Sequence, residues 1–194
     1  MQLVSLAVDE QQRAEARSDA PTRRGGAMSE KRAEQLNRLE QYLDGAELSE
    51  RSHIRKDGEV IWIPEVYCHN GHSMMVDSEA FDGHRAVHLH VHTSGTGELH
   101  TDLFLSPIFN DARKEGPELP EETAFKLMCP VCHEELRQLV PCTCRPGAYR
   151  RAVYLTPDPD ELGAVGICEM YGCPQSFVTE DGELLYEVVV EKTR

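Results

Sequence analysis

The sequence predicts a small α+β protein that is mainly β, with one N-terminal α-helix followed by two β-hairpin modules that each hold a metal ion. Three observations lead to this fold class. From residue 59 onward, short apolar runs alternate with polar residues and are separated by Gly, Pro and Asp turns. Near the N-terminus, between residues 29 and 44, apolar residues recur at helical spacing. Seven cysteines and one histidine form four short pairs, which is typical of structural metal sites.

The composition indicates a soluble globular protein. Of the 194 residues, 40% are hydrophobic and 28% are charged, which suits one ordinary domain or two small ones. No apolar run approaches the roughly 18–20 residues of a membrane span. The first residues lack the basic start and apolar core of a signal peptide. We therefore expect a cytoplasmic protein with no membrane partner.

The charge is distributed unevenly along the chain. Residues 1–56 contain ten acidic and ten basic groups, so the whole net charge of −14 lies in residues 57–194. Such a surface repels a phosphate backbone, so nucleic-acid binding is not expected and a basic protein partner is. A local basic cluster lies close to the cysteines of the second module and consists of Arg145, Arg150 and Arg151. It keeps nucleic-acid binding as an alternative, unless these arginines pair with neighbouring acidic residues.

The N-terminal part is predicted to contain a disordered lead-in, 1–28, then a helix and linker, 29–57. The lead-in shows no apolar periodicity, and Met28 is a second candidate start. The helix begins after Ser29 and ends before Gly45. Its apolar stripe either covers the core of the chain or docks on a partner subunit. Residues 45–57 read as a polar link that ends in a turn at Gly58.

The first predicted metal-binding module covers residues 58–140. A β run from Val60 leads into the first ligand pair, Cys68 and His72. Gly71 tolerates the positive φ that would turn the second ligand back toward the first. His72 is therefore the predicted ligand, and His69 is expected to point to solvent.

A long segment, 73–128, is inserted before the next ligands and contains a predicted β-hairpin around residues 86–105. On its first strand, valine and leucine share one face and three histidines share the other. These histidines and one on the return strand are a candidate third, open metal site for hydrolytic or oxidative chemistry: His88, His90, His92 and His100. Histidines two apart on a strand lie about 7 Å apart, so we favour packing of the apolar face inward, with the histidines on the solvent or interface side.

The remaining ligands are three cysteine pairs, and the second module covers residues 141–194. The pairs are Cys129 with Cys132, Cys142 with Cys144, and Cys168 with Cys173. Sequential pairing joins the first ligand pair of the chain to the second, and the third to the fourth. An interleaved cross-brace is the alternative. We favour the sequential scheme because each set then brackets its own β-hairpin.

The Cys129-Pro-Val-Cys132 turn and its partner pairs resemble the zinc-ribbon (rubredoxin-like) group over about residues 67–178. Residues 67–72, Tyr-Cys-His-Asn-Gly-His, are also similar to the first knuckle of some small zinc proteins that bind RNA polymerase. The resemblance implies two ribbons and two zinc ions per chain. Iron is an alternative at the four-cysteine site, either alone or in a cluster. In a reducing compartment the cysteines read as metal ligands rather than disulfides.

We therefore predict a non-enzymatic double zinc ribbon that acts as an interaction or accessory module of a larger protein assembly. Closed Cys and Cys/His sites leave no vacant coordination position for hydrolysis. Three alternatives stay open from the sequence. They are a metal-dependent enzyme using the histidine strand, a rubredoxin-like electron-transfer protein, and a transcription-associated, nucleic-acid-binding zinc ribbon.

Overall fold

The structure is a computed structural model, and it describes residues 30–44, 52–93, 98–121, 123–159 and 163–188. It confirms a mainly β protein with a helix on the N-terminal side. The helix is α2 (Glu30–Asp44). The predicted lead-in, 1–28, lies outside the described residues.

Twelve strands follow the helix within the described residues, and most are short. In chain order they are β1 (Arg55–Asp57), β2 (Val60–Trp62), β3 (Met75–Phe81), β4 (His84–Thr93), β5 (Leu99–Leu105), β6 (Lys114–Glu115), β7 (Phe125–Met128), β8 (Gln138–Pro141), β9 (Tyr149–Tyr154), β10 (Ala164–Cys168), β11 (Ser176–Glu180) and β12 (Glu183–Val188). The hairpin predicted around residues 86–105 corresponds to β4–β5, and β11 and β12 form a second hairpin near the C-terminal end of the described residues.

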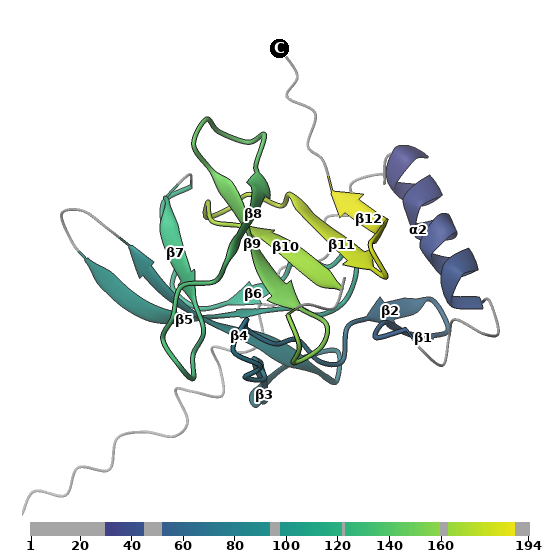
Figure 1. The fold of residues 1–194 in the computed structure, drawn as a ribbon, viewed down its shortest axis with the longest axis horizontal. Helices are drawn as coiled ribbons and strands as arrows, with labels where there is room; N and C mark the ends of the chain where they lie inside the picture. The colour runs from purple at the N-terminus through teal and green to yellow at the C-terminus, as the bar shows by residue number, and fades with distance from the viewer. Residues whose placement is uncertain (1–29, 45–51, 94–97, 122, 160–162, 189–194) are drawn as a thin grey trace, which may run out of the picture.

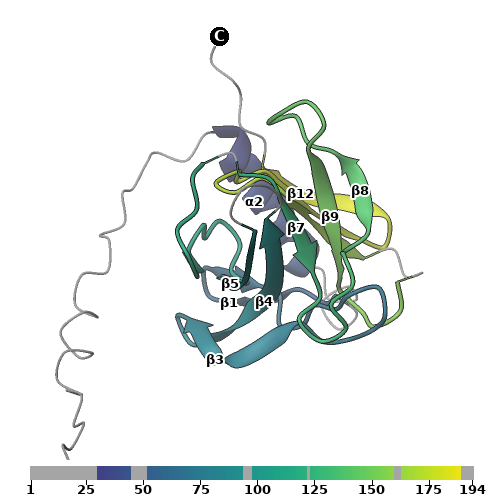
Figure 2. The same ribbon diagram turned by 90° about the vertical axis from the view of Figure 1, so that its left-hand side faces the viewer.

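The strands form a small β1–β2 hairpin and two five-stranded antiparallel sheets. We call the sheet of β3 to β7 the histidine sheet and the sheet of β8 to β12 the C-terminal sheet. The C-terminal sheet has the order β12-β11-β10-β9-β8 and lies over the histidine sheet (Figures 1 and 2). In the histidine sheet, β3 and β7 pair with opposite halves of β4, while β5 pairs along its length.

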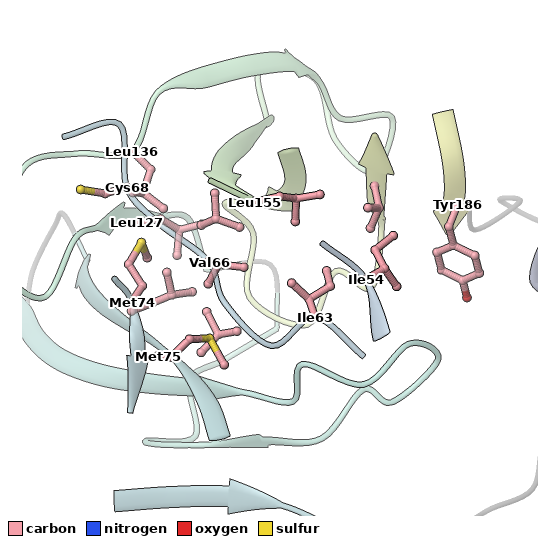
Figure 3. Packing of buried hydrophobic residues seen from close by; sticks show 14 of the residues in the cluster. Ile54, Ile63, Val66, Cys68, Met74, Met75, Leu127, Leu136, Leu155 and Tyr186 are labelled. Carbon is pink, nitrogen blue, oxygen red and sulfur yellow. The ribbon is translucent and has the colours of Figure 1, made fainter. Parts of the chain in front are cut away.

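One hydrophobic core lies between the sheets and takes residues from both predicted modules. Figure 3 shows Val66 and Leu127 from the first module packed near Leu155 from the second. All three are almost completely buried. The predicted boundary at residues 140 and 141 falls within β8, and the division into two modules stays a prediction.

Helix α2 lies beside β12 at one edge of the C-terminal sheet (Figure 1). Leu39 and Leu43 are buried and belong to the same core cluster as Leu185 and Tyr186. The spacing of four places both leucines on one helix face. The apolar stripe therefore covers the chain's own core, which is the first of the two interpretations made from the sequence.

The segment predicted as a polar link differs from that prediction at residues 52–57. Ser52 and Ile54 are buried, and the next three residues form β1. The Ser52 hydroxyl donates to the buried carboxylate of Glu180 at 2.6 Å, and the backbone amide of His53 donates to the same group. The partner lies 128 residues away in sequence, so the local polar composition gave no indication of this contact.

Candidate metal centres

The first group of candidate metal ligands brings together four side chains from two tight turns. These are Cys68, His72, Cys129 and Cys132, and their ligand atoms all lie within 4.8 Å of one another. Cys68 and Cys129 are completely buried, whereas the other two are partly exposed. The group contains the ligands that sequential pairing predicts.

The first turn is held by backbone hydrogen bonds within residues 68–72. The Gly71 amide donates to the Cys68 carbonyl at 3.0 Å, and the Cys68 amide donates to the His72 carbonyl at 3.0 Å. Gly71 has a φ of +76°, as the sequence predicted. A Cβ there would also lie 3.0 Å from the Pro157 carbonyl oxygen, so this glycine is required on two grounds.

The second turn has the same design. His133 takes the positive φ, +57°, and its amide donates to the Cys129 carbonyl at 2.9 Å. The Val131 amide donates to Cys129 Sγ at 3.4 Å, as the Asn70 amide does to Cys68 Sγ in the first turn. Each turn thus directs a backbone N–H at a buried sulfur, which favours the thiolate form that binds metal.

The pKa values of the two thiols in this second turn separate. Burial raises the pKa of the Cys129 thiol to about 11. Burial also opposes ionisation of Cys132, but hydrogen bonds from the Glu134 amide and the Asn70 side chain outweigh it and lower the pKa of Cys132 to about 7. Cys132 is therefore the thiol of this turn that ionises first and is ready to bind a cation.

His69 does not point to solvent, contrary to the sequence-based expectation. Its side chain is 11% exposed, and its Nε2 lies 3.1 Å from Glu134 Oε2. The same carboxylate accepts a hydrogen bond from Asn70 Nδ2 at 3.2 Å. His69 therefore braces the two turns of the first group against each other from outside the ligand set.

The second group consists of cysteines alone: Cys142, Cys144, Cys168 and Cys173. All seven cysteines of the chain are free thiols in the structure. The Sγ atoms of Cys142 and Cys173 lie 3.9 Å apart, and those of Cys144 and Cys168 lie 3.6 Å apart. The two groups follow the sequential pairing, and a cross-brace would require other neighbours.

The spacing within both groups fits a tetrahedral ion. Zinc–sulfur bonds of about 2.3 Å in a tetrahedron place two sulfurs about 3.8 Å apart. In the first group, Cys68 Sγ lies 3.5 Å from His72 Nδ1, and zinc with one sulfur and one nitrogen ligand requires about 3.6 Å. Both donor sets suit zinc, and four thiolates also suit iron, so the structure supports metal binding without selecting the metal.

The second group also contains a thiol that ionises readily. Hydrogen bonding to Cys168, followed by the backbone amide of Gln175, lowers the pKa of Cys173 to about 5. The hydrogen bond that Cys168 shares with Cys173 raises the pKa of the Cys168 thiol, and so does burial. Metal binding would remove this hydrogen bond between the two thiols, because every ligand thiol must lose its proton.

Arg150 lies beside the second group, and it forms one of the pairs with neighbouring acids that the sequence analysis left open. It is 5% exposed, its Nη1 lies 2.8 Å from Glu187 Oε1, and its Nη2 donates to Gln175 Oε1 at 3.3 Å. The same amide oxygen lies 3.1 Å from Cys142 Sγ. Its neighbour Arg151 pairs with Glu135 and Glu169. These two arginines therefore serve the fold, and they do not form a free basic surface for nucleic acid.

The histidine strand has the predicted two faces. Val87, Leu89 and Val91 are buried, and the three histidines between them lie on the other face, each about one-fifth exposed. His92 stacks on His100 across the β4–β5 pair, with ring centroids 4.0 Å apart.

Carboxylates satisfy these histidines. Asp102 Oδ1 lies 2.9 Å from His88 Nε2 and 3.2 Å from His90 Nδ1, and Glu98 lies 3.0 Å from His92 Nε2. These hydrogen bonds, partly opposed by burial, lower the pKa of Asp102. Within the described residues, metal-ligand groups of three or more are the two cysteine-rich ones, so a third site on this strand stays a prediction.

Comparison of the chain with known protein families, curated proteins and solved structures gave no match. The two cysteine-rich groups are consistent with zinc-ribbon-like sites on their geometry alone. In the part of the chain that the structure describes, no helix has the length and apolar character needed to span a membrane.

Proposed function

We propose that this chain is a non-enzymatic zinc protein in which both metal ions are structural, and that it acts as an interaction module in a larger protein assembly. One observation carries the proposal: each candidate centre is a complete set of four ligands. A closed tetrahedral set has no vacant position for water or substrate, so its contribution is to folding.

The position of each group within the fold supports a structural role. The first group joins the turn at 68–72 to the turn between β7 and β8. The second joins the β8–β9 connection to the β10–β11 connection. Each ion would therefore fasten segments distant in sequence at the ends of short strands. Strands of three to six residues gain much of their order from such constraints.

The interaction role rests on charge. Residues 57–194 carry the whole net charge of −14, and seven metal-bound thiolates with two zinc ions would make the folded region more negative. A partner with a basic surface is the electrostatic complement of this region. Nucleic acid is disfavoured for the same reason.

The test is metal content per chain, measured by elemental analysis together with a visible spectrum of the protein as purified. We expect two zinc ions and a colourless protein. The Cys132→Ser and Cys173→Ser variants should each lose one ion, because each removes a ligand from a different group. His69→Gln is the control, since it changes the turn at 68–72 of the first group without removing a ligand, and it should keep both ions.

Chelation then tests whether the metals are structural. Removing zinc should abolish the cooperative thermal unfolding transition and the β signal in circular dichroism. A metal-free protein with an unchanged spectrum would refute the structural role. A coloured protein with iron at the four-cysteine group would replace this proposal with an electron-transfer function.

A further inference from the structure

A cavity of about 280 Å³ lies between the two sheets and extends to the centre of the core. Its inner end is lined by Val66, Leu89, Leu127 and Val153, which are no more than 2% exposed. Protein interiors are close-packed, and voids much larger than a water molecule are few. A space of this size among aliphatic side chains is therefore a feature that calls for an occupant.

The cavity opens to solvent between two segments of the chain. The exposed members of its lining come from residues 110–114, before and within β6, and from residues 172–174, at the end of the second cysteine group. Several half-buried apolar side chains line the cavity and are partly exposed to water, among them Leu105, Ile108, Phe109, Val165, Ile167, Tyr171 and Val188. An apolar ligand would remove this surface from water, which favours binding.

A positive charge stands at the opening. Lys114 Nζ lies 3.4 Å from the centroid of the Tyr171 ring, and both residues line the cavity. The other cation of the rim, Arg113, is already paired with Asp82 and Asp111.

Lys114 differs from most basic side chains of the described residues in having no carboxylate partner. Within the described part of the chain, Lys114 forms no ion pair with a carboxylate. Six other basic side chains do form such pairs: Lys56, Arg85, Arg113, Lys126, Arg150 and Arg151. In a chain of net charge −14, an ammonium without a carboxylate partner at the mouth of an apolar cavity is available to an anion from solution.

We propose that this cavity binds a small amphipathic organic anion, whose apolar body fills the space between the sheets and whose charged head lies at Lys114. A dry apolar cavity of about 150 Å³ is sufficient to hold a benzene molecule. The cavity here is roughly twice that size, which suits a medium-length alkyl chain or two fused rings. This inference goes beyond the proposed structural role of the metals.

The experiment is isothermal titration calorimetry of octanoate into the metal-loaded protein, with octan-1-ol as the uncharged ligand of the same chain length. We expect saturable binding of one octanoate per chain. Leu105→Trp should abolish it, because the indole would occupy the cavity. Leu184→Trp is the matched control: Leu184 is 53% exposed and outside the cavity lining, so binding should persist.

Lys114→Met tests the position of the head group. It should weaken octanoate binding about two- to fivefold, as expected for a solvent-screened ion pair, and leave octan-1-ol binding unchanged. Lys126→Met, which lies outside the lining, should alter neither ligand.

Circular dichroism and metal content of each variant must match those of the wild type, so that lost binding is separated from lost folding. If Leu105→Trp fails this criterion, Ile167→Phe fills the cavity from the opposite sheet. The absence of saturable octanoate binding to the wild type, or wild-type binding by the filled variant, would overturn the proposal. Equal effects of Lys114→Met on both ligands would overturn the assignment of the head group.

Discussion

Arg150 is the residue through which the protein can compensate the charge of the four-cysteine group. Burial alone would lower the pKa of this guanidinium, but the hydrogen bonds that it donates to Glu187 and Cys142 raise it, so the side chain is held as a cation beside a candidate metal ligand. Its ring neighbour is Phe177, with the guanidinium 5.4 Å from the centroid. Four thiolates around a divalent ion carry a net charge of about −2, which a buried cation stabilises.

We expect Arg150→Met to weaken metal binding at the second group by about tenfold or more, the usual effect of losing a side chain that supports a metal ligand. The measurement is competition with a chromophoric chelator, which should remove one of two zinc ions at lower chelator concentration than in the wild type. Arg85→Met is the control, because Arg85 pairs with Glu65 and Asp77, and neither of these is a member of a ligand group. Loss of both ions together in Arg150→Met would contradict this role.

At the scale of one element, helix α2 is held by a few leucines. Leu39 is completely buried in the core cluster. Leu39→Ala should lower the free energy of unfolding by about 2–5 kcal/mol, because it removes apolar contact and leaves a cavity. Leu184→Ala, at an exposed position on β12, should change it by no more than about 0.5 kcal/mol. Urea denaturation of both variants decides the matter, and equal effects would mean that the helix is not part of the core.

The strands and the helix could be predicted because their signals are local. Alternation along β4 predicted its buried and histidine faces, and Gly71 predicted the turn at the first group. The two failures involve distant partners. His69 is turned inward by Glu134, and the segment at Ser52 is ordered by Glu180. Neither carboxylate is distinguishable in sequence from the many exposed acids of this chain.

The pairing of the cysteines depends partly on local signals and partly on distant contacts, so only part of it could be predicted. Ligand identity follows from short spacing, but the partner of each pair depends on how the sheets are stacked. The sequence favoured sequential pairing, and the ligand groups in the structure follow it. The cavity could not be predicted, because its strand residues, such as Val87 and Leu89 or Val165 and Ile167, alternate in sequence as those of an ordinary core do.

For the whole molecule, we expect the net charge of −14 to have the largest effect on association with partners. A basic protein partner would be attracted over a range set by the Debye length, about 10 Å at 0.1 M salt and about 3 Å at 1 M. Partners recovered from a pull-down at low salt should therefore be enriched in basic proteins and released at high salt. A partner set unaffected by salt would show that apolar contacts, and not charge, determine the association.

The register of the sheets also determines the order in which the two ligand groups can assemble during folding. Fifty-six residues, 73–128, separate the halves of the first group, and both β3 and β7 must pair with β4 before these halves meet. In the second group, 23 residues, 145–167, separate Cys144 from Cys168. Since each doubling of a loop costs about 0.6 kcal/mol in closure entropy, the shorter loop closes first.

If both groups hold zinc, as proposed above, a cell short of zinc would then accumulate a half-loaded chain with its ion at the four-cysteine group. In such a chain β8 to β12 would be fastened, while the turn at Cys68 would be open and exposed to proteases. Limited proteolysis during stepwise addition of zinc should show cleavage near residue 70 that persists until the second equivalent is bound. The long insertion that carries the histidine strand would thus make the stability of the protein a measure of zinc supply.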